Sequence, residues 1–82
     1  MEYDEDKVDD VTLALMYLVT WKEKKGFSWS AWKSFDWDTM DRLHQKGLIS
    51  NPKSKAKSVI LSDEGFQRAE RLFHEMFVKE ER

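Results

Sequence analysis

Three lysines near the middle of the chain have the side-chain type and the spacing to bind an anionic partner. Lys53, Lys55 and Lys57 alternate with serine and alanine in the segment 51–58. If this tip is extended, every second side chain points the same way, and the three ammonium groups lie near the spacing of successive backbone phosphates. The alternative is an ordinary solvated turn. The sequence therefore predicts a candidate phosphate-binding loop.

The distribution of charge is more informative than its total. The net charge of -2 argues against a generic nucleic-acid binder, whose phosphate contacts usually make the whole domain basic. From Arg42 to Ser62, however, there are five lysine or arginine side chains and no acidic one, so this stretch carries +5 and the remaining residues carry -7. Positive charge is thus concentrated around the candidate loop.

A helix is predicted immediately before this loop. Trp37, Met40 and Leu43 are spaced about one helical turn apart, and Gly47 follows as a stop signal. Glycine reaches the left-handed conformation that closes a helix without a steric penalty. Asp36 and Asp38 are both possible N-caps, with Asp41 in the first turn. We therefore predict a helix over residues 37–46.

The polar face of this helix provides candidate contacts to a DNA groove. Arg42 and Gln45 have the side chains that read guanine and adenine edges, and Lys46 would lie beside the loop. Asp38 and Asp41 would meet phosphates or bases as anions, which is unfavourable. The interpretation that we favour for both carboxylates is capping of the helix N-terminus.

A β-hairpin and an amphipathic helix are predicted after this helix. Residues 48–49 and 59–61 are apolar and partly β-branched, as in two short strands that flank a polar tip. Ser62 can cap a helix over residues 63–80, with two carboxylates in its first turn. The apolar face of that helix comprises Phe66, Ala69, Phe73, Met76 and Phe77.

The order of these elements resembles a known architecture. The series Gly47-Leu48-Ile49, a basic polar turn, and then Ser58-Val59-Ile60-Leu61-Ser62-Asp63-Glu64-Gly65 resembles the wing of winged-helix regulators of the MarR and PadR kind. This resemblance, which covers the C-terminal half, implies duplex DNA binding by a homodimer, with the loop lysines on phosphates. As a whole, the chain also resembles a family of small uncharacterised bacterial proteins of unknown function. That likeness supports the fold and implies no activity.

The N-terminal part is predicted to be a frayed acidic tail, residues 1–7, and a long helix over about Asp6 to Lys24. The helix is apolar on most sides. A chain of 82 residues has little protein to cover all of them, so we expect a homodimer with this helix in its interface. The alternative is that the last helix covers the second face within a monomer. One apolar stripe of this N-terminal helix consists of Val8, Val11, Leu15 and Leu18, which repeat at helical spacing.

The aromatic segment from Phe27 to Trp37 is predicted to contain a short helix over Trp29 to Ser34, which would complete a helix-turn-helix. Its tryptophans could stack exposed bases, as aromatic platforms do in single-strand binders. The interpretation that we favour is core packing, with Trp29, Trp32 and Trp37 gathered around one helical corner.

Several classes of chemistry have no support in the sequence. Cysteine is absent, and His44 and His74 each have only one carboxylate a turn away, which is too few ligands for zinc. We find no phosphate-binding glycine loop, nucleophile elbow or acid/base dyad. We therefore expect no enzyme activity, cofactor, metal or small-molecule ligand. The N-terminus lacks a signal sequence and no apolar run could span a membrane, so we expect a cytoplasmic protein without membrane contact.

Together these patterns predict one domain over residues 1–82, of α+β class but mostly α: a compact winged helix-turn-helix with a two-stranded β-hairpin wing. The predicted function is duplex DNA binding in transcription regulation. The predicted contact residues are Arg42, Gln45, Lys46, Lys53, Lys55 and Lys57. The alternative is a protein–protein interaction or homodimerisation module that does not bind DNA.

Overall fold

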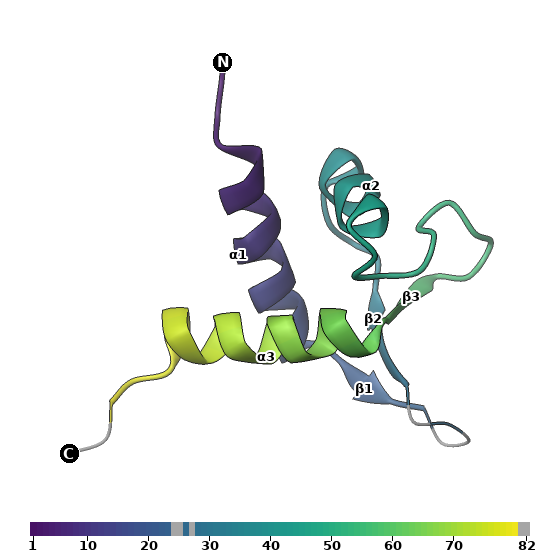
Figure 1. Cartoon of the computed structure of the whole chain (residues 1–82). Helices are drawn as coiled ribbons and strands as arrows, with labels where there is room; N and C mark the ends of the chain where they lie inside the picture. Colours follow the sequence, from purple (N-terminus) through teal and green to yellow (C-terminus); the bar gives the residue numbers. More distant parts are fainter. Residues whose placement is uncertain (24–25, 27, 81–82) are drawn as a thin grey trace.

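The computed structural model describes residues 1–23, 26 and 28–80. Its elements follow the order α1 (Glu5–Leu18), β1 (Trp21–Lys22), β2 (Trp29–Trp32), α2 (Trp37–Gln45), β3 (Ser58–Leu61) and α3 (Asp63–Phe77). Figure 1 shows α3 lying across the C-terminal end of α1, with α2 on one side of α1 and the strands near the start of α3. The segment between α2 and β3 extends from the edge of the molecule.

The three strands form one antiparallel sheet in the order β1-β2-β3. Trp29 pairs with Leu61, and Ala31 pairs with Val59. Because paired residues of an antiparallel sheet point to the same face, these four side chains form the inner face against the helices. Trp32, which pairs with Ser58, lies on the opposite face.

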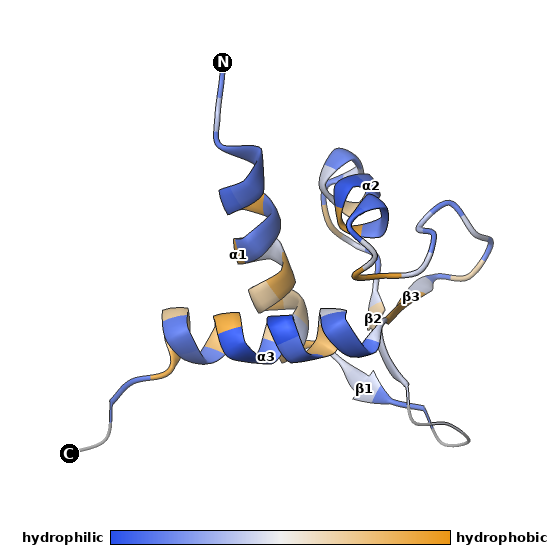
Figure 2. Cartoon of the chain, viewed as in Figure 1, coloured by the Kyte–Doolittle hydropathy of each residue, from blue (hydrophilic) through white to orange (hydrophobic). Residues whose placement is uncertain are grey.

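A single apolar core joins the three helices to the inner face of the sheet. Ala14 on α1 and Ala69 on α3 are both fully buried, and side chains this small allow two helices to approach closely. Figure 2 shows apolar and polar residues alternating along α3, as expected for a helix with one buried face. Other fully buried apolar side chains in the described ranges include Leu13, Met16, Ala31, Met40, Leu43, Leu48 and Val59.

Three of the four predicted helix boundaries in the second half of the chain are confirmed to within one residue, whereas α3 ends at Phe77 rather than at residue 80. Asp36 accepts a hydrogen bond from the backbone N–H of Thr39 at 3.1 Å and caps α2. Gly47 has a φ of 76° and ends this helix in the left-handed region, as its sequence position predicts. Ser62 caps α3 by accepting from the N–H of Gly65 at 3.0 Å.

The N-terminal helix differs from its prediction at both ends. It begins at Glu5, with Asp4 as its cap, so the predicted frayed tail of residues 1–7 is too long. It ends at Leu18 rather than near Lys24, a residue that lies outside the described part of the chain. The Thr20 hydroxyl donates to the carbonyl of Tyr17 at 2.8 Å, which replaces a helical bond at this end. The chain then enters β1.

The short helix predicted over Trp29 to Ser34 is wrong, because this segment is strand β2. Its residues alternate between the two faces of the sheet, and its backbone pairs with β1 on one side and β3 on the other. Tryptophan is common in strands, and pairing on both sides outweighs any local helical preference. The structure therefore has no helix at this predicted first position of a helix-turn-helix.

The predicted hairpin is present only in part. Ile49 forms an isolated bridge to Leu61, and the N–H of Ser50 donates to the carbonyl of Ile60 at 2.8 Å. The main partner of β3 is β2, not the segment after α2. The reason is length, since the proline at position 52 follows too soon for that segment to extend its ladder.

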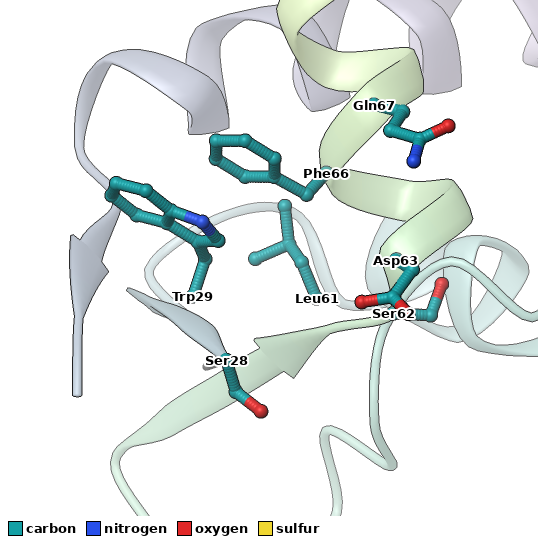
Figure 3. Close-up of a pocket in the computed structure, with 7 residues that line it drawn as sticks. All are labelled: Ser28, Trp29, Leu61, Ser62, Asp63, Phe66 and Gln67. Atoms are coloured by element: carbon teal, nitrogen blue, oxygen red, sulfur yellow. The ribbon is translucent and has the colours of Figure 1, made fainter. Parts of the chain in front are cut away.

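The predicted tryptophan corner is also wrong. Trp29 stacks on Phe66 of α3 with ring centroids 4.5 Å apart and an interplanar angle of 9°, as Figure 3 shows. Trp32 and Trp37, in contrast, remain 53% and 58% exposed. The three rings are spread over a strand and a helix start because the segment is extended, which turns successive side chains to opposite faces.

Candidate nucleic-acid interface

The loop between α2 and β3 is an ordered turn. Asn51 accepts, through its side-chain oxygen, the backbone N–H of Lys53 at 2.9 Å. Lys33, which follows β2, donates from Nζ to the carbonyls of Pro52 at 2.6 Å and Ser54 at 2.7 Å. Its own backbone N–H donates to the carbonyl of Lys57. We name residues 51–57 the basic loop, and its backbone is tied to the sheet mainly through Lys33.

The three predicted phosphate contacts, Lys53, Lys55 and Lys57, are all exposed on this loop. Lys53 lies 3.9 Å from the carboxylate of Asp41, a long and well-solvated ion pair that contributes little. Among residues 1–23, 26 and 28–80, no ion pair involves Lys55 or Lys57. The loop therefore presents positive charge to solvent. Residues 52–57 form turns and bends rather than an extended tip, so the common direction predicted for the three lysines does not follow from strand alternation.

Arg42 and Lys46 occupy a different environment from the one predicted. Arg42 donates from Nε to both carboxylate oxygens of Asp9, at 2.9 and 3.1 Å, and its Nη1 lies 3.2 Å from Glu5. Lys46 donates to Asp6 and to Asp9, each at 2.9 Å. We name these five residues the ion-pair cluster. It joins α1 to α2, and it neutralises two of the six predicted DNA contacts.

The electrostatics of the cluster follow from the burial of Asp9, which is 1% exposed. A carboxylate removed from water needs paired charge, and Arg42 and Lys46 supply it. Hydrogen bonds to Asp9 and Asp6 raise the pKa of Lys46, and the bond from Lys46 lowers the pKa of Asp6. For Arg42, burial works against the charged form, but the bonds and charge of Asp9 still raise its pKa. Both cations are thus held charged.

The remaining predicted contact, Gln45, is exposed near the end of α2. The start of the same helix carries Asp38, which is exposed, and Asp41, which is partly exposed. Asp36, one of the two N-cap candidates, is the residue that caps the helix, whereas Asp38 and Asp41 lie within the helix and the capping role predicted for them is wrong. With Arg42 directed to α1, the exposed surface of α2 is more acidic than the sequence predicts.

A second exposed feature lies next to the basic loop. Trp32 pairs in register with Ser58, the first residue after the loop. Its ring contacts that of Trp21 on β1, with centroids 4.9 Å apart. Ile60, two residues further along β3, is 48% exposed on the same face. We name Trp21, Ser30, Trp32, Ser58 and Ile60 the outer sheet face.

Sequence reasoning missed three residues of this arrangement. Lys33 was not singled out, because nothing local shows that its ammonium group reaches the loop. Asp9 lies near the start of α1, where any carboxylate suits the helix dipole, and only its place among apolar residues signals a buried ion pair. Trp32 was assigned to the core because its exposure depends on the strand that replaced the predicted helix.

The cavities add little to this picture. The cavity in Figure 3, of about 100 Å³, is bounded by Trp29, Phe66 and the start of α3. That volume corresponds to about three water molecules at liquid density. The two histidines lie apart from this cavity: His44 Nδ1 lies 3.0 Å from the carbonyl of Ile49, and the His74 ring contacts Tyr17 edge-on.

None of the helices in the described ranges has the length and the apolar character that a membrane span requires.

Over residues 1–23, 26 and 28–80, the chain is a small α+β domain with three helices and a three-stranded antiparallel sheet. It belongs to a family described as a domain of unknown function (DUF6429), whose model matches residues 4–79. It is also 51% identical over 79 residues to "Uncharacterized protein y4hR" of Sinorhizobium fredii (strain NBRC 101917 / NGR234), covering 96% of this chain and 100% of that protein. No solved structure matches the chain. The resemblance to a family of small proteins of unknown function is thus confirmed.

Proposed function

We propose that this protein binds nucleic acid through the basic loop. The observation that supports the proposal is the exposure of Lys53, Lys55 and Lys57 on one loop that contains no acidic residue. Lys33 holds the loop backbone by two hydrogen bonds, so the lysines extend from an ordered support. Ordered cations lose less conformational freedom when they bind phosphates.

The winged-helix interpretation is part of this proposal for the segment from α2 to α3. In it the basic loop acts as the wing and contacts the backbone of duplex DNA, as in a transcription regulator. The ion-pair cluster works against the other half of the prediction, since Arg42 would have to leave Asp9 to reach a base edge. We therefore propose backbone contact by the loop and give α2 no role in reading bases.

Salt dependence tests the proposal directly. Affinity for a mixed-sequence duplex and for one of its separated strands is measured at several salt concentrations, for the wild type and for the triple alanine variant of Lys53, Lys55 and Lys57. The variant should reduce the slope of log affinity against log salt by about three units on the duplex. A triple alanine variant of Lys7, Arg71 and Lys79 removes the same charge elsewhere and should leave the slope unchanged. Absence of wild-type binding to both probes at low salt would refute the proposal.

A homodimerisation module is the second candidate, and a separate observation supports it. The apolar stripe predicted on α1 faces away from the core: Leu15 and Leu18 are 41% and 66% exposed. Val8 and Val11 extend the same stripe and line an open groove of about 430 Å³. An uncovered apolar stripe with coiled-coil spacing is typical of a helix that pairs with a second copy.

Light scattering at micromolar protein concentration tests this second candidate. The wild type should have the mass of a dimer, and the double variant Leu15→Glu, Leu18→Glu should have the mass of a monomer. Trp37→Glu changes an equally exposed apolar side chain on α2 and should leave the dimer intact. A monomeric wild type would remove this candidate without affecting the nucleic-acid proposal.

A further inference from the structure

The outer sheet face presents an aromatic surface that the core does not use. Trp32 is 53% exposed, although tryptophan buries more apolar area than any other residue when it is packed. Its ring is supported on one side by Trp21, with 4.9 Å between centroids and an interplanar angle of 44°. Both tryptophans belong to paired strands, so this surface is anchored to a rigid element.

The residues beneath the rings complete the support. Ser30 pairs directly with Trp21, precedes Trp32 by two residues on the same face of β2, and is only 1% exposed. Its hydroxyl donates to Glu23 at 2.8 Å, so its polar group is satisfied. The buried hydroxyl below the exposed indole therefore does not need a further partner, and the indole can stay exposed without leaving a buried polar group unpaired.

The position of Trp32 relative to the basic loop is the decisive feature. Trp32 pairs with Ser58, and the residue before Ser58 is Lys57, the last lysine of the loop. Lys33, the residue after Trp32, reaches under the loop to the carbonyls of Pro52 and Ser54. The outer sheet face and the basic loop therefore adjoin where β2 ends and β3 begins, and there the backbone N–H of Lys33 also donates to the carbonyl of Lys57.

The exposed tryptophan and the loop lysines match two parts of a nucleic acid, its bases and its phosphates. Lysines bind phosphates of any nucleic acid, but an indole face can stack only on a base whose own face is free. In a duplex, neighbouring base pairs cover those faces, so stacking on a side chain requires an unpaired or extruded base. The charge beside the outer sheet face also argues for a polyanion rather than for an apolar protein surface.

We propose that the outer sheet face and the basic loop form one binding site for single-stranded nucleic acid. Trp32 stacks an unpaired base, Trp21 supports its ring, and Lys53, Lys55 and Lys57 contact the phosphates that follow. This inference depends on the proposed function, because it assumes that the loop binds phosphate. It adds the substrate class: a flexible single strand, which is bound more tightly than the duplex.

The test compares three labelled DNA probes by fluorescence anisotropy: a mixed-sequence strand, the same strand annealed to its complement, and an abasic strand of equal length. The wild type should bind the strand about 10-fold or more tighter than the abasic probe, as one stacked base contributes. Trp32→Leu should lose that advantage, and its salt slope should be unchanged, because no charge is removed. Trp32→Phe, which keeps an aromatic face, should retain most of the affinity.

Trp37→Leu is the matched control, since Trp37 is similarly exposed but belongs to α2 rather than to the sheet. It should bind all three probes as the wild type does. Equal wild-type affinity for the base-bearing and abasic strands would overturn the inference, as would unchanged strand binding by Trp32→Leu. If the lysine variant still loses affinity in that case, only the stacking claim fails. If no probe binds, the proposed function fails with it.

Discussion

The guanidinium of Arg42 on α2 donates from Nε to both carboxylate oxygens of Asp9 on α1, at 2.9 and 3.1 Å, and Asp9 is almost fully buried. These two residues are 33 positions apart in the sequence. Their contact fixes how α2 lies against α1 and directs Arg42 away from solvent. It is the main reason why α2 has no role in our proposal for nucleic-acid binding.

Replacing Asp9 should destabilise the fold through this contact. Asp9→Asn keeps the shape of the side chain but removes the charge that pairs with Arg42 and Lys46. Removing one partner of a buried ion pair leaves the other charge uncompensated, and we expect a loss of about 2–4 kcal/mol, because Arg42 stays partly hydrated. Urea unfolding measures it. The control Asp6→Asn, at an exposed partner of Lys46, should have a much smaller effect.

The pH dependence of stability should show the same cluster at both extremes. The pKa of Asp6 is lowered from 3.8 in the folded state, so its contribution is present above that value and is lost as pH falls through the folded pKa. The pKa of Lys46 is raised from 10.5, so its contribution is present below that value and is lost as pH rises through the folded pKa. The contribution of these two residues to stability should therefore be nearly constant between these limits.

Lys46→Gln provides the check on this assignment. Without the ammonium group, Asp6 loses the largest cause of its lowered pKa and keeps only the weaker attraction of Arg42 and Arg68, and the alkaline titration of Lys46 is removed. Melting temperatures measured across the pH range should fall less steeply at both ends than for the wild type. If the variant keeps the wild-type slopes, the pH dependence must originate in other groups.

Gly65 should not tolerate alanine, although it lies inside a helix. A Cβ at this position would meet the backbone carbonyl of Leu48 far inside van der Waals distance. At an exposed helical site the same change would stabilise the helix by about 1 kcal/mol. Here we expect a loss of at least about 2 kcal/mol, because backbone atoms must move. Thermal unfolding decides the sign, and a stabilised Gly65→Ala variant would contradict the packing of α3 on Leu48.

The hydroxyl of Ser62 has two roles that can be separated. It accepts the N–H of Gly65 at 3.0 Å as the cap of α3, and it donates to the carbonyl of Gly47 at 2.7 Å. Ser62→Ala loses both bonds and should cost about 1–2 kcal/mol in urea unfolding. Ser62→Asp keeps the acceptor and loses the donor, so it should retain part of that stability. Equal losses in both variants would exclude a capping contribution.

Lys33 should act on the basic loop through its position rather than through its charge. Lys33→Met keeps the aliphatic stem and removes the donations to Pro52 and Ser54. Hydrogen exchange of the loop amides should become faster, while β2 and β3 stay protected. If the loop binds nucleic acid, affinity should fall and the salt slope should change by less than one unit. Unchanged loop exchange would show that other contacts order the loop.

The sequence predicts the features of this protein that depend on a few neighbouring residues. Both ends of α2 and the start of α3 follow from Asp36, Gly47 and Ser62, because caps act within one helical turn. The exposed lysines of the basic loop follow from composition, since such a segment has nothing apolar to bury. These predictions hold because their physical causes are local.

The tertiary structure decides what depends on distant partners. The segment from Trp29 is a strand because β3, about thirty residues later, supplies its hydrogen bonds, which places Trp32 at the surface. Arg42 faces inward because a buried carboxylate on α1 requires its charge. Neither partner can be identified from local pattern, because the energy of a pairing or of a buried charge exists only once the chain has brought both groups together.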